Sequence, residues 1–375
     1  MSISKIRLAA GFISVIILGA CGAPASGGSA ASTARASATA SASPSTSAVP
    51  DAPASAVVVK DFLVYGGANY GVSIVDLKGR TLASATAAKR PRAGQTMVQI
   101  SSISTSKTRL YYLDGASDVR FLAPDGSRGL ATRISLEVNR AVAFAVSPDD
   151  QRIAVAVLDF NRYPVGTRLY VEDVNGGGNH VELFSSATTM EWPVGWHAGK
   201  LVVAMGVNVQ PQNSGEFFMW GHGYHVIDAT SGQRIVSVCD GIDSYFPPVP
   251  AGTLCTNAPV DETATWEGKE TPVKQVGTCV VNGPLSPDGT RVGARISSNG
   301  NCGVSAVSLV NLSGGIEATP ATGSPQGWLD GTHLVVGSAD GGQPEAAGTI
   351  YDTQARTTRP IQAAGFFGAA LPGGL

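Results

Sequence analysis

Residues 146–153 read Val-Ser-Pro-Asp-Asp-Gln-Arg-Ile, and residues 285–292 read Leu-Ser-Pro-Asp-Gly-Thr-Arg-Val. In each stretch the proline sets φ for the first corner of a tight turn, and the aspartate side chain can close that turn. Short apolar runs rich in β-branched residues lie on both sides, as in Ile153–Val157. A turn of this kind between two such runs predicts a β-hairpin.

Related turns recur along the chain. Gly195–Gly199 (Gly-Trp-His-Ala-Gly) is repeated at Gly327–Gly331 (Gly-Trp-Leu-Asp-Gly), three units of about 44 residues later. Weaker copies lie at Ser106-Lys107 and Ala251-Gly252. We therefore expect these turns to occupy one equivalent position in a repeating unit.

A second class of turn follows a strand that ends in an acidic residue or Asn. It recurs about every 46 residues, at Val75-Asp76, Pro124-Asp125, Glu172-Asp173, Ile227-Asp228, Trp266-Glu267, Val310-Asn311 and Tyr351-Asp352. The two classes alternate, so each unit has four strands, A to D, with an A–B turn and a C–D turn. This period with four strands is typical of a β-propeller blade. The sequence thus predicts an all-β fold, a single β-propeller of four-stranded antiparallel blades.

The turns also give the number of blades. Seven turns of the second class and six of the first predict seven blades, with the missing A–B turn in a first unit that begins at Phe62-Leu63-Val64-Tyr65. Six blades is the alternative, if residues 240–276 are an insertion. The apolar segment 364–371 is expected to supply strand A of blade one and close the ring, which removes an exposed edge.

The Ser-Pro-Asp-Gly turns resemble the repeats of TolB-type and WD-repeat-like bacterial propellers. The resemblance covers most of residues 57–371. It implies architecture only, because propellers with one fold carry many functions.

The N-terminus reads as an export signal. Lys5 and Arg7 precede the apolar stretch Leu8–Leu18, which ends in Leu18-Gly19-Ala20-Cys21. This ending resembles the lipobox of bacterial lipoproteins. The resemblance implies a signal peptide at residues 1–20, cleavage before Cys21, acylation of Cys21 and a place on the outer face of the bacterial membrane. The alternative is an ordinary secretory signal with an incidental cysteine.

Residues 21–55 are predicted to be a disordered tether, and residues 56–375 the propeller. After Cys21 the tether consists mainly of Ala, Ser, Thr, Gly and Pro, and only Arg35 and Asp51 are charged. Such a segment cannot bury a core. As a flexible coil it would span on the order of 30 Å.

Four further cysteines lie in the predicted propeller. An even number in an exported chain indicates two disulfides. Three pairings are open, and we favour the shortest loops, Cys239–Cys255 and Cys279–Cys302. No pair has the C-x-x-C spacing of a structural zinc site.

Composition and motifs exclude several functions. Charged residues make up 14% of the chain and the net charge is −2, so no basic excess points to nucleic acid. We find no catalytic motif, and we predict no cofactor. We also predict no metal site, because His222 and His225 are three residues apart and would face opposite sides of a strand. The one basic cluster, Lys89–Arg92, is interpreted as a solvated loop, with contact to anionic lipid headgroups as the alternative.

The function we predict is a lipid-anchored, extracytoplasmic binding module for an envelope protein, peptide or glycan; the alternative is a propeller hydrolase or lyase acting on extracellular glycans. The B–C and D–A connections of blades three to five are long and carry aromatic residues and Arg, which recognition surfaces favour. The candidate binding face comprises Asn161, Arg162, Tyr163, Trp220, His222, Asp243 and Tyr245. The alternative role for its aromatics is to seal the central channel.

Overall fold

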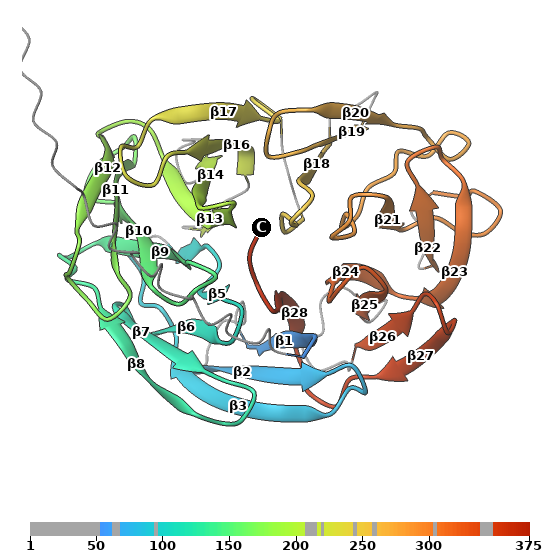
Figure 1. Ribbon diagram of the computed structural model, residues 1–375, viewed down its shortest axis with the longest axis horizontal. Helices are drawn as coiled ribbons and strands as arrows, with labels where there is room; N and C mark the ends of the chain where they lie inside the picture. The colour runs from blue at the N-terminus through green and yellow to red at the C-terminus, as the bar shows by residue number, and fades with distance from the viewer. Residues whose placement is uncertain are drawn as a thin grey trace, which may run out of the picture. The chain divides into compact units, whose positions relative to one another are not determined.

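The computed structural model describes residues 53–61, 68–93, 97–206, 216–218, 221–242, 246–256, 261–302, 306–337 and 348–375. The compact unit spans Pro50–Leu375. It is an all-β ring of seven blades around a central axis (Figure 1). Across the described residues, no helix is long and apolar enough to span a membrane.

Four consecutive blades are complete four-stranded antiparallel sheets. From the axis outward, blade 1 is β28 (Phe366–Leu371), β1 (Ser55–Lys60), β2 (Asn69–Asp76) and β3 (Thr81–Ala88). Blade 2 is β5 (Ile103–Thr105), β6 (Leu110–Asp114), β7 (Asp118–Leu122) and β8 (Arg128–Arg133). Blade 3 is β9 (Arg140–Val146), β10 (Arg152–Asp159), β11 (Gly166–Asp173) and β12 (Val181–Ser186). Blade 4 is β13 (Glu191–His197), β14 (Lys200–Gly206), β16 (Gly221–Ile227) and β17 (Arg234–Val238).

In the part of the chain that the structure describes, blades 5 and 6 have three strands each, and blade 7 is again complete. Blade 5 is β18 (Thr253–Cys255), β19 (Asp261–Ala264) and β20 (Glu270–Val273). Blade 6 is β21 (Arg291–Ala294), β22 (Ala306–Asn311) and β23 (Ile316–Thr322). Blade 7 is β24 (Ser324–Trp328), β25 (His333–Gly337), β26 (Thr349–Asp352) and β27 (Thr357–Pro360).

Prolines explain why the inner strand is reduced in blades 5 and 6. Residues 246–250 read Phe-Pro-Pro-Val-Pro, and their ladder shrinks to one bridge, between Val249 and Gly252. In blade 6 the inner position holds Pro284, and one bridge joins Leu285 to Val292. Proline has no N–H to donate to a ladder. Residues 240–276 therefore belong to a blade with a modified inner edge, and the six-blade alternative is wrong.

The ring is closed by the two ends of the propeller, as predicted. β28 pairs antiparallel with β1, with Leu371 opposite Ser55 and Phe366 opposite Val59. β28 is thus strand A of blade 1. Strand B is β1, not the expected Phe62–Tyr65, which lies outside the described residues.

The Ser-Pro-Asp turns have the geometry that their sequence predicts. The Ser147 hydroxyl donates to Asp149 Oδ1 (2.6 Å) and accepts from the Arg152 N–H (2.9 Å). Ser286 makes the same two bonds, to Asp288 (2.5 Å) and from Arg291 (3.0 Å). Each serine therefore closes its turn from the inside.

The two Gly-Trp turns join neighbouring blades. The indole N–H of Trp196, on blade 4, donates to Ala145 O on blade 3 (3.1 Å), and the Arg152 guanidinium lies 4.7 Å from the ring centroid. The arrangement recurs between blades 7 and 6 with Trp328, Pro284 and Arg291. The repeated Ser-Pro-Asp and Gly-Trp motifs are two halves of one contact between blades.

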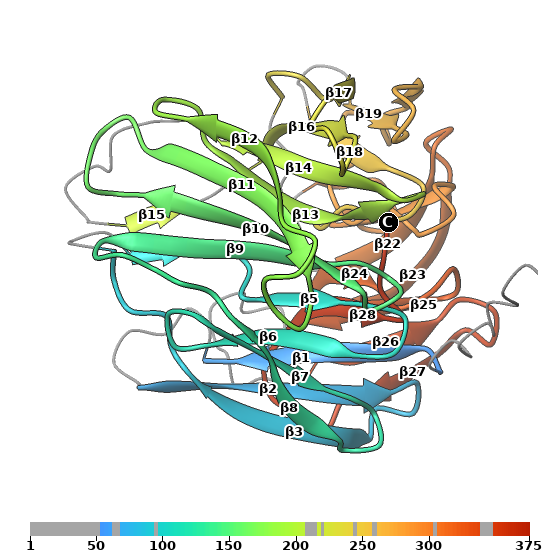
Figure 2. The same cartoon turned by 60° about the vertical axis from the view of Figure 1, so that its left-hand side comes forward.

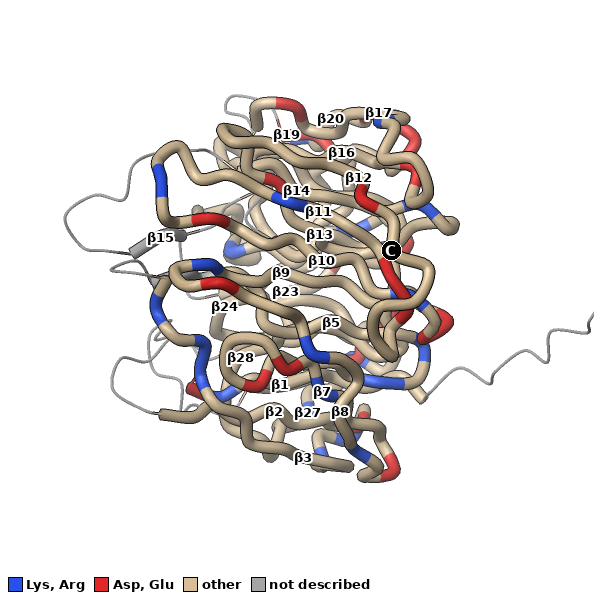
Figure 3. The backbone as a smooth tube through the Cα atoms, turned by 90° about the vertical axis from the view of Figure 1, so that its left-hand side faces the viewer, with Lys and Arg blue, Asp and Glu red and all other residues tan. Residues whose placement is uncertain are grey.

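The two faces of the ring differ. The A–B and C–D turns, such as 147–152 and 286–291, form what we call the turn face. The B–C and D–A connections, such as 134–139 and 160–165, form the opposite loop face. A parallel pair of short strands, β4 (Met97–Gln99) and β15 (Glu216–Phe218), belongs to the loop face. Figure 2 shows β15 on the side away from the end of the chain, which lies at the turn face. Figure 3 shows the ring edge-on, with the end of the chain on the right.

Candidate functional site

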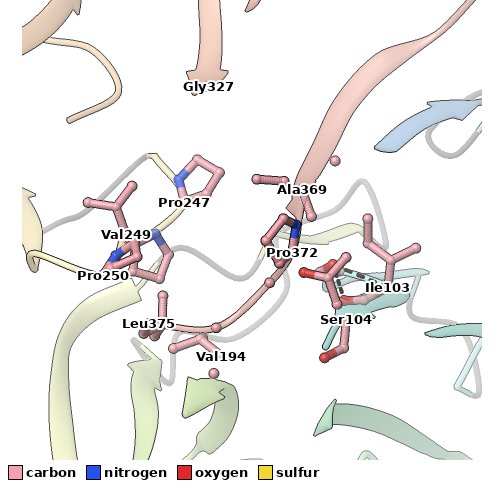
Figure 4. A pocket seen from close by; sticks show the side chains of 18 of the residues that line it. Ile103, Ser104, Val194, Pro247, Val249, Pro250, Gly327, Ala369, Pro372 and Leu375 are labelled. Carbon is pink, nitrogen blue, oxygen red and sulfur yellow. Dashed lines mark hydrogen bonds between the residues drawn. The ribbon is translucent and has the colours of Figure 1, made fainter. Parts of the chain in front are cut away.

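The inner strands surround a central cavity of about 640 Å³. Its walls are mainly apolar, because the inner strands present aliphatic side chains, glycines and prolines to the axis. Pro247 and Pro250 from blade 5 lie across the cavity from Ile103 and Ala369 of blades 2 and 1 (Figure 4), and Pro248 also lines it. Such walls suit an apolar ligand or an extended peptide rather than a charged small molecule.

The two serine hydroxyls on the described cavity wall are already hydrogen-bonded. The Ser104 hydroxyl accepts the Val146 N–H (2.9 Å), and the Ser101 hydroxyl donates to Ile103 O (3.1 Å). Neither hydroxyl has a basic side chain beside it on the described wall, where Asp330 is the one charged side chain. This part of the wall therefore offers no pair of nucleophile and base.

The Asp330 carboxylate is used by its own turn. It accepts the Thr332 N–H (2.7 Å) and lies 2.9 Å from His333 Nδ1. Burial alone would raise the pKa of Asp330, but the hydrogen bonds from Thr332 and His333 outweigh it, and the pKa lies below its ordinary value. The group is therefore ionised at neutral pH and does not act as a general acid.

The last residues of the chain run along the cavity. Beyond β28, the Gly373 N–H donates to Ser106 O (2.6 Å) and the Leu375 N–H donates to Trp196 O (2.9 Å). Figure 4 shows Leu375 beside Val194, on the side of Val249 and Pro250. We call residues 372–375 the tail segment. Its role was not predicted from the sequence, because no local pattern indicates that a Gly-rich end returns to the axis.

On the loop face, blade 3 carries three members of the predicted binding face, Asn161, Arg162 and Tyr163. The Asn161 side chain joins two connections. Its Oδ1 accepts a hydrogen bond from Asn139 Nδ2 (3.0 Å), and its Nδ2 donates to Val138 O and Asp159 Oδ1 (3.0 Å each). Tyr163 is 48% exposed beside these bonds, and Val138 is 79% exposed.

Arg162 is the charged member of this patch. Its side chain is 54% exposed, and its Nε lies 3.7 Å from Asp159 Oδ2. Burial raises the pKa of Asp159, but hydrogen bonds from Asn161 and the charges of Arg140 and Arg162 bring it below its ordinary value. The structure therefore brings Asn161, Arg162 and Tyr163 together on a connection held by its own polar network. We call these residues, with Val138, the blade-3 patch.

The other predicted members are less fully described. Trp220, Asp243 and Tyr245 lie outside the described residues. His222 is half-buried on β16, three residues before His225. The β14–β16 register shifts between these two histidines, where Gly223 has a φ of +99°, so the regular alternation of faces assumed in the sequence analysis is interrupted there. Within the described residues, His, Cys, Asp and Glu side chains nowhere form a group of three suited to a metal ion.

The backbone of the aromatic connection in blade 4 is partly fixed. Phe217 lies opposite Val98 in the parallel pairing of β15 with β4, the segment that enters blade 2. Connections from two separate blades therefore meet on the loop face.

Both predicted disulfides are present. Cys239–Cys255 joins the end of blade 4 to β18, and Cys279–Cys302 joins the entry of blade 6 to its B–C connection; their Cα atoms are 5.5 Å and 5.4 Å apart. Both lie where the inner ladders are shortest. They are structural links, with no role in the candidate site.

The basic cluster is not a solvated loop at Arg90. The Arg90 guanidinium is buried and donates to Val142 O (2.9 Å) and Ile100 O (3.4 Å), which ties the segment between blades 1 and 2 to blade 3. Burial lowers the pKa of Arg90 to about 10. The interpretation of the cluster as a solvated loop is therefore wrong for this residue.

No protein-family model matches the chain, and no curated protein shows a significant sequence match. The similar solved structures include an oligogalacturonate lyase in complex with manganese, with 10% identity, TM-score 0.46 and coverage of 78% of this chain and 89% of that one. TolB from Acinetobacter baumannii has 14% identity, TM-score 0.39 and coverage of 82% and 79%. Apo AztD from Citrobacter koseri has 10% identity, TM-score 0.42 and coverage of 84% and 96%. At such identities the likeness is one of fold and says nothing about chemistry.

Proposed function

We propose that this protein is a binding module of the bacterial envelope, lipid-anchored at Cys21, that recognises an envelope protein, peptide or glycan through its loop face. The observation that supports this most directly is the blade-3 patch. An exposed aromatic ring and an exposed guanidinium stand on connections whose polar groups are already hydrogen-bonded to each other. A surface held in this way loses little conformational entropy when a partner binds.

The chemistry of the patch agrees with recognition. Tyr and Arg are enriched at interfaces, because each gives large contact area and directional hydrogen bonds. The Arg162 side chain is 54% exposed, and its Nε lies 3.7 Å from Asp159 Oδ2 at the base of the connection. The turn face differs, because the Ser and Asp side chains of its Ser-Pro-Asp turns are hydrogen-bonded to each other within the turn.

The test compares matched single substitutions on the two faces. Envelope partners would be captured by in-cell crosslinking with the wild type, and purified partner binding would then be measured for Arg162→Ala, Tyr163→Ala and, on the turn face, Lys200→Ala and Lys269→Ala. We expect the first two to weaken binding at least tenfold and the other two to leave it unchanged. Loss of binding only with the turn-face variants, with all folds intact, would refute the assignment.

The anchor is tested separately. In the proposal Cys21 carries the lipid, so Cys21→Ser should leave an unprocessed or released protein. Membrane fractions washed with carbonate would be probed for the wild type and the variant. Equal retention of the wild type and Cys21→Ser in the membrane would refute the lipid anchor and would leave the loop-face proposal unaffected.

A further inference from the structure

The tail segment occupies the cavity without being part of any sheet. β28 ends at Leu371, where it lies opposite Ser55, so ring closure is complete before Pro372. The segment nevertheless continues along the axis and contacts blades 2, 3 and 4. A cavity of about 640 Å³ remains beside it.

The segment binds through its backbone, as an extended peptide does. Two of its N–H groups, those of Gly373 and Leu375, donate to Ser106 O and Trp196 O, which belong to different blades. These carbonyls are positioned by rigid elements, the A–B turn of blade 2 and the strand β13. The two acceptors are therefore fixed in place, and they bind backbone N–H groups of the occupant rather than its side chains.

Close approach restricts the occupant to glycine at the first position. A Cβ at Gly373 would lie 2.0 Å from Thr105 Oγ1, far inside van der Waals contact. At the second position Gly374 has φ of +122°, which residues with a side chain rarely adopt. The site therefore selects two successive glycines.

The third position accepts a large apolar side chain. Leu375 packs against the core cluster that includes Trp192 and Trp196. Space for it exists because residue 195 is glycine: a Cβ there would lie 2.7 Å from Leu375 Cδ1. Gly331 lies on another part of the cavity wall, and a Cβ added there would have no atom within 4 Å.

We infer that this part of the cavity is a binding site for an extended Gly-Gly-apolar peptide segment of a partner, and that residues 373–375 are its intramolecular occupant. A partner's segment enters by displacing the tail segment and extends into the remaining cavity. This site is separate from the blade-3 patch. It recognises its occupant through two backbone carbonyls that accept N–H groups, and it requires glycine at the positions of Gly373 and Gly374.

The experiment uses a labelled synthetic peptide with the sequence of residues 370–375, Ala-Leu-Pro-Gly-Gly-Leu. Binding would be measured by saturation-transfer NMR and fluorescence anisotropy up to millimolar peptide, against the wild type and a variant that lacks residues 373–375. A short linker keeps an intramolecular occupant at an effective concentration of about millimolar. We therefore expect the truncated protein to bind the peptide at least tenfold more tightly than the wild type.

A matched pair of glycine substitutions locates the binding. In the truncated protein, Gly195→Ala should weaken peptide binding at least tenfold, and Gly331→Ala should leave it unchanged. If the truncated protein does not fold, full-length Leu375→Ala replaces it and should bind the peptide more tightly than the wild type. The inference is overturned if the peptide fails to bind the folded variant, binds the wild type equally, or responds equally to the two substitutions.

Discussion

Blades 3 and 5 occupy equivalent places in the ring but hold together differently. Blade 3 has four strands of six to eight residues, and residues 153–158 of β10 are buried without interruption. Blade 5 has strands of three and four residues, and its inner edge is the proline-rich segment 246–250. A disulfide and the Trp266 indole, which donates to Val249 O (2.9 Å), supplement its few ladder bonds.

The comparison shows that a blade can keep its place in the ring with little pairing of its inner strand when a disulfide and a side-chain hydrogen bond add to the remaining backbone bonds. In blade 3 the backbone pairing runs along the full length of four long strands. In blade 5 the same geometry depends on a few specific groups. We therefore expect single changes to have larger local effects in blade 5 than in blade 3.

The largest effect is expected from removing the closing strand. Deletion of residues 364–375 takes β28 from blade 1 and exposes the edge of β1. Cooperative unfolding should be lost, or its midpoint should fall by more than about 10 °C, because several kcal/mol of burial and ladder bonds disappear. Differential scanning calorimetry checks this, with deletion of residues 373–375 alone as the control. A deletion variant that melts like the full chain would contradict ring closure.

Removal of the Cys239–Cys255 disulfide comes next. The link closes a loop of 16 residues, and cross-links of this size stabilise proteins by about 3 kcal/mol. The double substitution Cys239→Ala and Cys255→Ala should lower the free energy of unfolding by about that amount. Amide exchange should rise first in residues 251–256, measured by mass spectrometry. If exchange rises equally in blade 3, blade 5 is not the locally weak region.

A matched pair of tryptophan substitutions sharpens the comparison. Trp196→Phe and Trp266→Phe each remove one buried indole hydrogen bond, at a cost of about 1–3 kcal/mol. Ala145 keeps its place in the β9–β10 ladder, whereas Val249 retains only its bridge to Gly252. The Gly252 amide should therefore lose protection in Trp266→Phe, while the Ala145 amide stays protected in Trp196→Phe. Equal amide exchange at these two sites would show that the Trp266 hydrogen bond does not stabilise the proline-rich segment 246–250.

These differences mark how far the sequence predicts the molecule. Local rules predict the turns, because Ser147 and Ser286 act within five residues of their partners. Blade number and ring closure follow from the repeat of those turns. Both disulfides match the pairing with the shortest loops, which we favoured among the three that the sequence leaves open.

What the sequence does not predict depends on contacts between distant residues. Arg90 looks like part of a solvated basic loop, yet its partner Val142 O is 52 residues away. The tail segment binds carbonyls of Ser106 and Trp196, and glycine itself gives no sign of a close approach. Asn161, Arg162 and Tyr163 are neighbours in the sequence, whereas the Asn139–Asn161 bond that fixes their connection crosses two connections and has no local signal.

The smallest effect concerns His180, at the rim of blade 3. Hydrogen bonds with Glu172 (3.1 Å) and Glu182 (3.1 Å) raise its pKa above the ordinary value of about 6.5. The folded state thus holds a proton more tightly than the unfolded chain, so the contribution to stability is complete below about pH 6.5 and is lost as the pH rises through the raised pKa. Half-exposed pairs are screened, so we expect less than about 1 kcal/mol. Unfolding midpoints of the wild type and His180→Gln, measured from pH 5 to pH 9, should differ most at the acid end and converge above neutrality. A difference that grows with pH would mean that His180 is stabilising as the neutral ring. A difference as large as that from the blade 5 disulfide would mean that blade 3 also depends on individual side chains, against the contrast drawn between the two blades.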